Sequence, residues 1–262
     1  QGDAPAVGER RAREGGLDAK TRRSVYEGAR IRGNMLPDVL MSQLRDEDAG
    51  EPVGLRVMRI ATHHAARSRG LGSRLLSEIR SEFAPSVDWL GTGFGATPEL
   101  VEFWRANGYG TIHLATTRNQ SSGEYSILLL DPITEAGEDL HEYHSRWFAA
   151  RVLDVLGDAL SDMDPDVVRA ALRACEDRAP LHLSADNWRL VAAASFGPAL
   201  YSVDPAPFRE LVTHYFTSGT ELDLTARDER LLVRKLLQLH PWEAVAEELE
   251  YVSPSEAMRS LG

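Results

Sequence analysis

The sequence predicts an α/β domain followed by a mainly α-helical domain, and three observations support this prediction. In the first half of the chain, two strand patterns alternate with two helical patterns. Two further strand patterns follow, separated by a polar loop, which is typical of an antiparallel pair. From Ala136 onward only helical periods occur. The change falls at Asp131-Pro132, so we expect one domain over residues 1–133 and a second over residues 134–262.

The elements of the first domain follow from periodicity and from residues that begin or end helices. Residues 1–13 have no usable period and predict a loop or a frayed start. Pro37 fits the first turn of a helix, and Gly108 fits the end of another. Helices are expected over 17–30, where the spacing is broken, and over 36–44, 72–83 and 98–107. Strands are expected over 55–62, 87–94, 111–115 and 125–130.

The second domain shows helical periods only. Several of them begin with residues that cap helix N-termini: Asp164 before Pro165, Ser184, and Thr225 with Asp228 three positions later. Helices are expected over roughly 137–159, 164–176, 184–195, 204–217, 225–239 and 241–250.

Composition limits the choice of partners only weakly. The 262 residues carry a formal net charge of −11, and an acidic chain is a poor general binder of nucleic acid because phosphates need local positive charge. Lys20 and Lys235 are the only lysines; the other basic residues are arginines. This composition resembles that of proteins from salt-loving microbes, and a GC-rich genome explains it equally well. We therefore base the partner prediction on local motifs.

Other classes of protein are excluded more directly. No apolar run approaches the ~20 residues of a membrane span, and no signal peptide opens the sequence. Cys175 is the single cysteine, which excludes an internal disulfide and a cysteine-rich zinc site and fits a reducing cytoplasm. We read Cys175 as a packing residue. His141 and His144 have helical spacing for two metal ligands, but no further ligand completes a site, so we expect a solvated helix face and no metal.

The segment Arg59–Leu76 carries the chemistry. A strand leads into a tight turn with the pattern Arg67-x-x-Gly70-x-Gly72, and a helix begins at once. Glycines permit positive φ and leave no Cβ between the turn amides and a ligand. These amides and the positive helix start form a phosphate site, and one pyrophosphate cradle after one strand fits coenzyme A. The dinucleotide and Walker A patterns fit less well, and a structural turn without ligand is the alternative.

A series of motifs extends this pattern. The helix that ends in Phe103-Trp104-Arg105-Ala106-Asn107-Gly108-Tyr109, placed after the second strand, resembles the GNAT acetyltransferase superfamily. The full series resembles the tRNA(Met) cytidine acetyltransferases over about residues 14–132 and, more thinly, through the helical tail. Its members are Glu14-Gly15-Gly16-Leu17, Arg32-Gly33-Asn34, Arg59-Ile60-Ala61, Phe94 to Leu100, Phe103-Trp104 and Ser121-Ser122-Gly123.

The resemblance implies a GNAT-like mixed sheet and acetyl transfer from acetyl-CoA to the N4 amine of a cytidine in tRNA or other RNA, most simply the wobble cytidine of elongator tRNA(Met). It implies acetyl-CoA contacts on the strand, in the pyrophosphate turn and at the next helix start. These residues are Ile60, Ala61, Thr62, Arg67, Ser68, Arg69, Gly70, Leu71, Gly72, Ser73 and Glu99.

The mechanism points to further residues. The cytosine amine is a weak nucleophile, so the reaction needs positioning, polarisation of the carbonyl and removal of a proton. Backbone N–H groups of residues 60–62 would polarise the carbonyl, and His63 or His64 would take the proton. Many GNAT enzymes protonate the leaving thiolate with a tyrosine at the position of Trp104; here Tyr109, water, or unassisted departure is left.

RNA contact requires local positive charge. Arg30 and Arg32 lie near the proposed site in sequence. In the tail, a set of four cations falls on one helix face, and the alternative is a solvated face paired with neighbouring acids. This set is Arg227, Arg230, Arg234 and Lys235.

The sequence also departs from the family pattern. The resemblance implies an N-terminal ATPase module that we do not expect within these 262 residues, so ATP or GTP would enter only through that module. Residues 7–13 are too charged for a buried strand, so the sheet is expected to lack its first strands and to expose an edge that an oligomer or another chain part covers. The rival functions are an acetyltransferase for a protein or small amine, and a non-catalytic truncated RNA-binding fragment.

Overall fold

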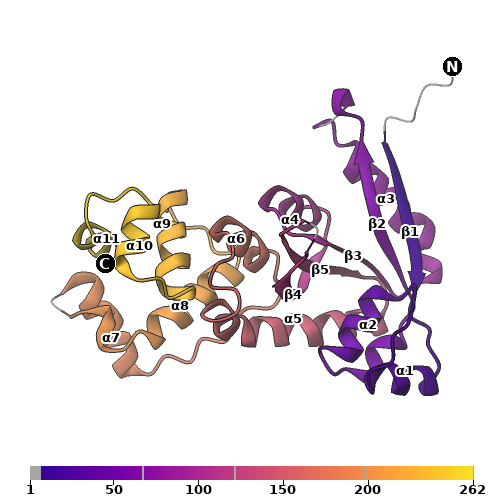
Figure 1. Ribbon diagram of the computed structural model, residues 1–262, viewed down its shortest axis with the longest axis horizontal. Coiled ribbons are helices and arrows are strands. Elements are labelled where there is room, and N and C mark those ends of the chain that lie inside the picture. The colour runs from indigo at the N-terminus through magenta and orange to yellow at the C-terminus, as the bar shows by residue number, and fades with distance from the viewer. Residues whose placement is uncertain (1–6, 67, 121, 198, 262) are drawn as a thin grey trace. The chain divides into compact units, whose positions relative to one another are not determined.

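A mixed sheet of five strands forms the centre of the first part of the protein (Figure 1). The computed structural model describes residues 7–66, 68–120, 122–197 and 199–261. The strand order is β1-β2-β3-β5-β4, in which β2 runs parallel to β3 and antiparallel to β1, and β3 runs antiparallel to β5. The strands are β1 (Val7–Glu14), β2 (Gly54–Thr62), β3 (Trp89–Gly95), β4 (Gly110–Arg118) and β5 (Tyr125–Pro132). The predicted α/β class with a mixed sheet is confirmed.

Strand β1 corrects the prediction of a loop or frayed start for residues 7–13, which were expected to be too charged for a buried strand; residues 1–6 of that prediction lie outside the described residues. It pairs with β2 over eight residues and ends the sheet on its side among the described residues. An edge strand tolerates charge because long side chains reach water or lie along apolar neighbours. The Arg11 guanidinium lies 4.3 Å from the centroid of the Phe83 ring, and Arg13 donates a hydrogen bond to the Ser86 carbonyl at 2.9 Å.

The helices around the sheet agree with the sequence pattern to within a few residues at most ends. The N-cap of α1 is Asp18, whose carboxylate accepts from the Thr21 amide at 2.9 Å. Gly108 follows α4 with φ +87°, a conformation that favours glycine and ends the helix as predicted. These helices are α1 (Ala19–Tyr26), α2 (Met35–Ser42), α3 (Leu71–Phe83) and α4 (Pro98–Arg105).

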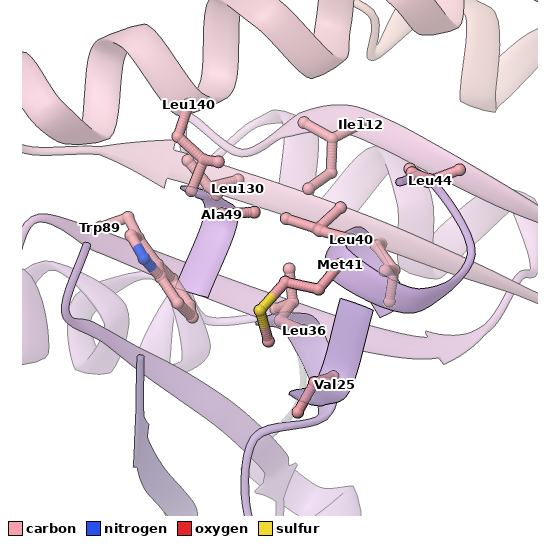
Figure 2. Close-up of a cluster of buried hydrophobic side chains, with 11 residues drawn as sticks. Val25, Leu36, Leu40, Met41, Leu44, Ala49, Trp89, Ile112, Leu130 and Leu140 are labelled. Atoms are coloured by element: carbon pink, nitrogen blue, oxygen red, sulfur yellow. The ribbon is translucent and has the colours of Figure 1, made fainter. Parts of the chain in front are cut away.

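A buried apolar cluster fixes α2 against the sheet (Figure 2). The glycines of β3 permit this close approach, because a Cβ at Gly91 would lie 2.7 Å from Leu36 and one at Gly93 would lie 2.5 Å from Met35. The cluster includes Val25, Leu36, Leu40, Met41, Leu44, Ala49, Trp89, Ile112, Leu128, Leu130 and Leu140.

The C-terminal part is helical, as predicted. Ser184 with Asn187 and Thr225 with Asp228 form two capping boxes, which confirms these predicted helix starts. The pattern over 225–239 is an α-helix that continues as a π-helical turn, Val233–Leu237, and the last helix was not predicted. The helices are α5 (Glu135–Leu156), α6 (Pro165–Arg173), α7 (Ala185–Phe196), α8 (Ala206–Thr217), α9 (Ala226–Leu232), α10 (Trp242–Glu248) and α11 (Pro254–Leu261).

The chain groups into two compact units that interleave in sequence. The first holds β1 to β3, most of β5 and the start of α5, and the second holds everything from Ser145 on, with the short segments 96–102 and 114–125. The single boundary at Asp131-Pro132 stays a prediction. Among the described helices, none combines the length and the apolar character that a bilayer crossing needs.

Candidate active site

The parallel strands β2 and β3 separate partway along their length. They pair from Gly54↔Trp89 to Val57↔Thr92 and no further within the described residues. Beyond this point β2 continues beside β1, while β3 continues beside β5 (Figure 1). The backbone groups of β2 after Val57 that point away from β1 therefore have no described strand beside them, and they are available to a ligand.

A bulge in β2 lies at the point of separation. Arg10 pairs with Arg59 and Arg11 with Val57, so Met58 is an extra residue in β2. Its side chain is 49% exposed. A bulge bends a strand and redirects its side chains, so it turns the following residues of β2 away from β3.

The turn after β2 ends in an uncapped helix start. Gly70 is the N-cap of α3 with φ +73°, and no side chain caps this end of the helix. The first amides of an α-helix have no acceptor within the helix and attract anions. A Cβ at Gly70 would meet no atom within 4 Å, so the N-cap residue is open on that side. Arg69 and Arg74 are exposed beside it.

Gly72 packs closely against side chains, and its predicted contact with acetyl-CoA stays a prediction. A Cβ at this position would lie 3.1 Å from Cζ of Phe103 and 3.9 Å from Cδ1 of Ile60. The missing side chain therefore makes room for the Phe103 ring, and the clearance for a ligand lies at Gly70. The Ile60 side chain, from β2, also lies close to Gly72, so the turn packs against this strand.

The structure brings most of the predicted acetyl-CoA residues together in the first unit. Ile60 and Thr62 are half-buried, and Ala61 between them is exposed. Arg67 lies outside the described residues. Glu99 is exposed in the first turn of α4 and belongs to segment 96–102 of the second unit, so it is not among the residues grouped here. The remaining predicted residues form the turn and the first turn of α3: Ser68, Arg69, Gly70, Leu71, Gly72 and Ser73.

Both candidate bases follow β2 directly. His63 and His64 are exposed, and their ring centroids lie 4.2 Å apart. Nδ1 of His63 accepts a hydrogen bond from the Ala65 amide at 3.3 Å, which occupies the lone pair of that nitrogen. A base needs a lone pair that can receive the substrate proton. His64 therefore fits the role better than His63 in this conformation.

Tyr109 is badly placed to protonate a thiolate. Only 2% of it is exposed, and its hydroxyl has no hydrogen-bond partner among the described residues. Burial raises the pKa of Tyr109, and the nearby Asp131 carboxylate raises it further. Trp104 is also buried, with its ring centroid 4.8 Å from that of Tyr109. This pair fits packing, and water or unassisted departure is left for the thiolate.

Comparison with known proteins agrees with this geometry. A family model described as GNAT acetyltransferase 2 matches residues 10–86 and 73–134. A tRNA(Met) cytidine acetyltransferase of Haloferax volcanii is 62% identical over 251 residues, which are 96% of this chain and 33% of the relative. One of Haloarcula marismortui is 58% identical over 252 residues (96% and 32%), and one of Thermococcus kodakarensis is 32% identical over 240 residues (90% and 30%).

Over 96% of its length the chain is therefore similar to part of the tRNA(Met) cytidine acetyltransferases, and residues 10–134 match the GNAT acetyltransferase model. It spans about a third of the length of the curated relatives it matches. The first two relatives come from halophilic archaea, which agrees with the first explanation for the acidic, lysine-poor composition.

Two motifs of this acetyltransferase family lie against each other in the structure. The Glu14 carboxylate, 1% exposed, accepts from Arg56 Nε at 2.5 Å and from the Leu36 amide at 2.9 Å. The Gly15 amide donates to Asn34 Oδ1 at 2.8 Å. Glu14 thereby caps α2 from a strand, and these bonds fix the segment between α1 and α2. No local sequence signal predicts them.

That segment carries Arg30 and Arg32, both exposed. Arg30 lies 3.8 Å from Asp38, a loose ion pair that leaves its side chain 88% exposed. The structure therefore presents these two cations to solvent on a fixed segment, as the predicted RNA contact requires.

The four predicted tail cations bond within the chain. Arg230 holds Asp166 through two bonds of 2.9 and 2.6 Å. Arg227 donates to the carbonyls of Leu249 and Glu250, both at 2.8 Å. The alternative considered from sequence, a face paired with neighbouring groups, fits these two residues better, and RNA contact through them stays a prediction.

Arg234 and Lys235 require a correction, because each is only 9% exposed. Arg234 bonds Glu248, and Lys235 donates to the His240 carbonyl at 2.7 Å. Lys235 Nζ also lies 4.8 Å from the Trp242 ring centroid. Buried side chains with internal partners do not face RNA.

The histidines of α5 are also corrected. His141 and His144 are 5% and 0% exposed, so they do not form a solvated face. His144 Nε2 lies 2.8 Å from Asp46 Oδ2. Within the described residues, no group of three or more potential metal ligands occurs. Cys175 is buried, its thiol contacts Ser145 and the Asp177 carbonyl, and burial raises its pKa to about 11, as expected of a packing residue.

Proposed function

We propose that this chain transfers an acetyl group from acetyl-CoA to the N4 amine of a cytidine in RNA, with the wobble cytidine of elongator tRNA(Met) as its target. The observation that carries the proposal is the separation of β2 and β3 beside the uncapped start of α3. The printed names of the relatives support the RNA substrate. A tRNA substrate would place this activity in the cytoplasm.

The residues present fit coenzyme A. The open space at Gly70, the amides of α3 and the exposed Arg69 suit a pyrophosphate. The backbone of Ile60–Thr62 suits the extended arm of coenzyme A, which carries amide groups. These amides can hydrogen-bond to the strand backbone as a neighbouring strand would. These two groups would hold the phosphates and the arm, respectively.

The chemistry needs three contributions from the chain. Acetyl-CoA, when bound, supplies the activated thioester. Those backbone N–H groups of β2 after Met58 that point away from β1 would donate to the carbonyl oxygen as negative charge develops there. As the N4 nitrogen bonds to the carbonyl carbon and the C–S bond breaks, Nε2 or Nδ1 of His64 would take the proton that the amine loses, and the coenzyme A thiolate would leave, either unassisted or with a proton from water. Arg30 and Arg32 would hold phosphates of the RNA and orient the base.

Calorimetric titration with acetyl-CoA in high potassium chloride tests the site. Ser73→Glu places a carboxylate at the third residue of α3, beside the amides that would hold the pyrophosphate. We expect at least a tenfold rise in Kd, roughly the 1.4 kcal/mol that one unfavourable charge contact costs. Ser77→Glu, one turn further along the same exposed helix face, is the matched control and should leave Kd unchanged.

Mass spectrometry of nucleosides from tRNA incubated with the chain and acetyl-CoA then tests the substrate. At acetyl-CoA concentrations below the wild-type Kd, N4-acetylcytidine should form with wild type and at least several-fold more slowly with Ser73→Glu. Faster acetylation of a peptide or small amine would favour the protein or small-amine acetyltransferase. Binding of RNA without acetyl-CoA binding would favour the non-catalytic fragment.

A further inference from the structure

The β2–β3 ladder ends at a hydroxyl. Thr92, paired with Val57 in the last residue pair of the ladder, donates from Oγ1 to the Val57 carbonyl at 3.1 Å. Thr92 is 2% exposed, so this bond is made away from water. It is the only residue of β3 with a hydroxyl, because the sequence of the strand is Trp-Leu-Gly-Thr-Gly-Phe-Gly.

A hydroxyl at this place provides a hydrogen-bond donor where the ladder ends. Where two strands part, the last carbonyls lose the backbone N–H donors that the neighbouring strand would supply. A buried carbonyl without a donor is costly. Gly91 and Gly93, on either side of Thr92, carry no side chain that could donate. The Thr92 hydroxyl supplies a donor to Val57 just before the strands diverge.

The bulge acts at the same point from the other side of β2. Met58 is the extra residue opposite β1, and it follows Val57 directly. One side of β2 is therefore bent by the bulge while the other side is held to β3 by the Thr92 side chain. Beyond these two contacts the backbone of β2 pairs with β1 alone among the described residues.

We propose that Thr92 is a positioning residue for the acetyl-CoA site. Its hydroxyl fixes the end of the ladder at Val57, so that Met58–Thr62 keep the register with β1 that presents their outward backbone groups to the acyl-bearing arm of the ligand. Thr92 acts through Val57 and does not itself touch the ligand. The inference rests on the proposed function, because it assigns a ligand to the separated strands.

The test compares Thr92→Val, which has nearly the same shape and no hydroxyl, with Thr92→Ser, which keeps the hydroxyl. Calorimetry on the whole chain measures Kd for acetyl-CoA and for ADP, a probe that carries a pyrophosphate but no acyl arm. We expect Thr92→Val to raise the Kd for acetyl-CoA roughly tenfold, as the loss of one buried hydrogen bond would. The Kd for ADP should not change, and Thr92→Ser should bind acetyl-CoA within about twofold of wild type.

Hydrogen exchange provides a readout without a ligand. Peptide amides of Met58–Thr62 should exchange faster in Thr92→Val than in Thr92→Ser, while those of Gly54–Val57 stay protected by their ladder. Thr92→Ala is the second hydroxyl-free variant if Thr92→Val does not fold.

Each outcome decides the question. Unchanged acetyl-CoA binding in Thr92→Val, or an equal loss of ADP binding, would overturn the inference and leave the proposed function standing. A wild-type chain that does not bind acetyl-CoA would defeat the proposed function and the inference with it. Failure of both hydroxyl-free variants to fold would overturn the positioning role, because the hydroxyl would then serve the fold as a whole.

Discussion

The buried carboxylate of Glu14 offers the sharpest test of how the family motifs are coupled. Its two oxygens accept from Arg56 Nε, in a part-buried contact, and from the Leu36 amide, in a buried one. Glu14→Gln keeps the shape and one acceptor oxygen, but its NH₂ group must face one of the two donors. One buried donor then has no acceptor, which costs about 2 kcal/mol of unfolding free energy. Glu14→Ala leaves the Arg56 charge without its partner and should cost ~3–5 kcal/mol.

Urea unfolding followed by circular dichroism measures both values, provided that the slope with denaturant stays constant. Glu27→Gln is the matched control, because Glu27 pairs with Arg23 at 2.7 Å while 60% of its side chain is exposed. That exposed pair should contribute no more than about 0.5 kcal/mol. A Glu14→Gln variant as stable as Glu27→Gln would refute the claim that Glu14 holds β1, β2 and α2 together.

Three further predictions follow from the remaining observations. Arg32→Ala should weaken RNA binding and lower the slope of log K against log salt by about 0.7, as measured by fluorescence anisotropy. Burial raises the pKa of Asp131, and Arg80 offsets part of this rise. Because the pKa in the folded state lies above the unfolded value of about 3.8, wild type should lose stability relative to Asp131→Asn as pH rises from 3.8 through the folded-state pKa. Urea titrations at several pH values test this sign. Cys175 should react with iodoacetamide at pH 8 only after unfolding, because burial raises the pKa of its thiol to about 11.

The helices were predictable because their signals are local. Ser184 with Asn187 and Thr225 with Asp228 satisfy amides three residues away, and such pairs can be read directly from the sequence. Strand β1 was missed for the opposite reason. Its partner is β2, whose paired residues lie 40 to 55 positions further along the chain, and its arginines lie on an edge where charge is tolerated.

The site shows the same division between local and distant information. The turn before α3 and the order of strand, turn and helix were evident from the glycines. The separation of β2 from β3 was not, because it depends on the register of three strands and on one hydroxyl of β3. The tail cations show the limit of helical spacing as a signal. Arg230 pairs with Asp166, which lies 64 residues away in the chain, so the spacing of the cations alone could not reveal this ion pair.

A double substitution can test whether Gly72 lacks a side chain because of the Phe103 ring or because of the ligand. A Cβ there would lie 3.1 Å from the Phe103 ring, closer than ordinary van der Waals contact, so Gly72→Ala should cost ~1–3 kcal/mol through overpacking and should weaken acetyl-CoA binding by displacing the turn. Replacing Phe103 with Leu in the same chain removes the obstacle. Calorimetry of the double variant should then show acetyl-CoA binding restored toward that of Phe103→Leu alone. If the double variant binds as poorly as Gly72→Ala, the added methyl group must obstruct the ligand itself, and the packing explanation of Gly72 fails.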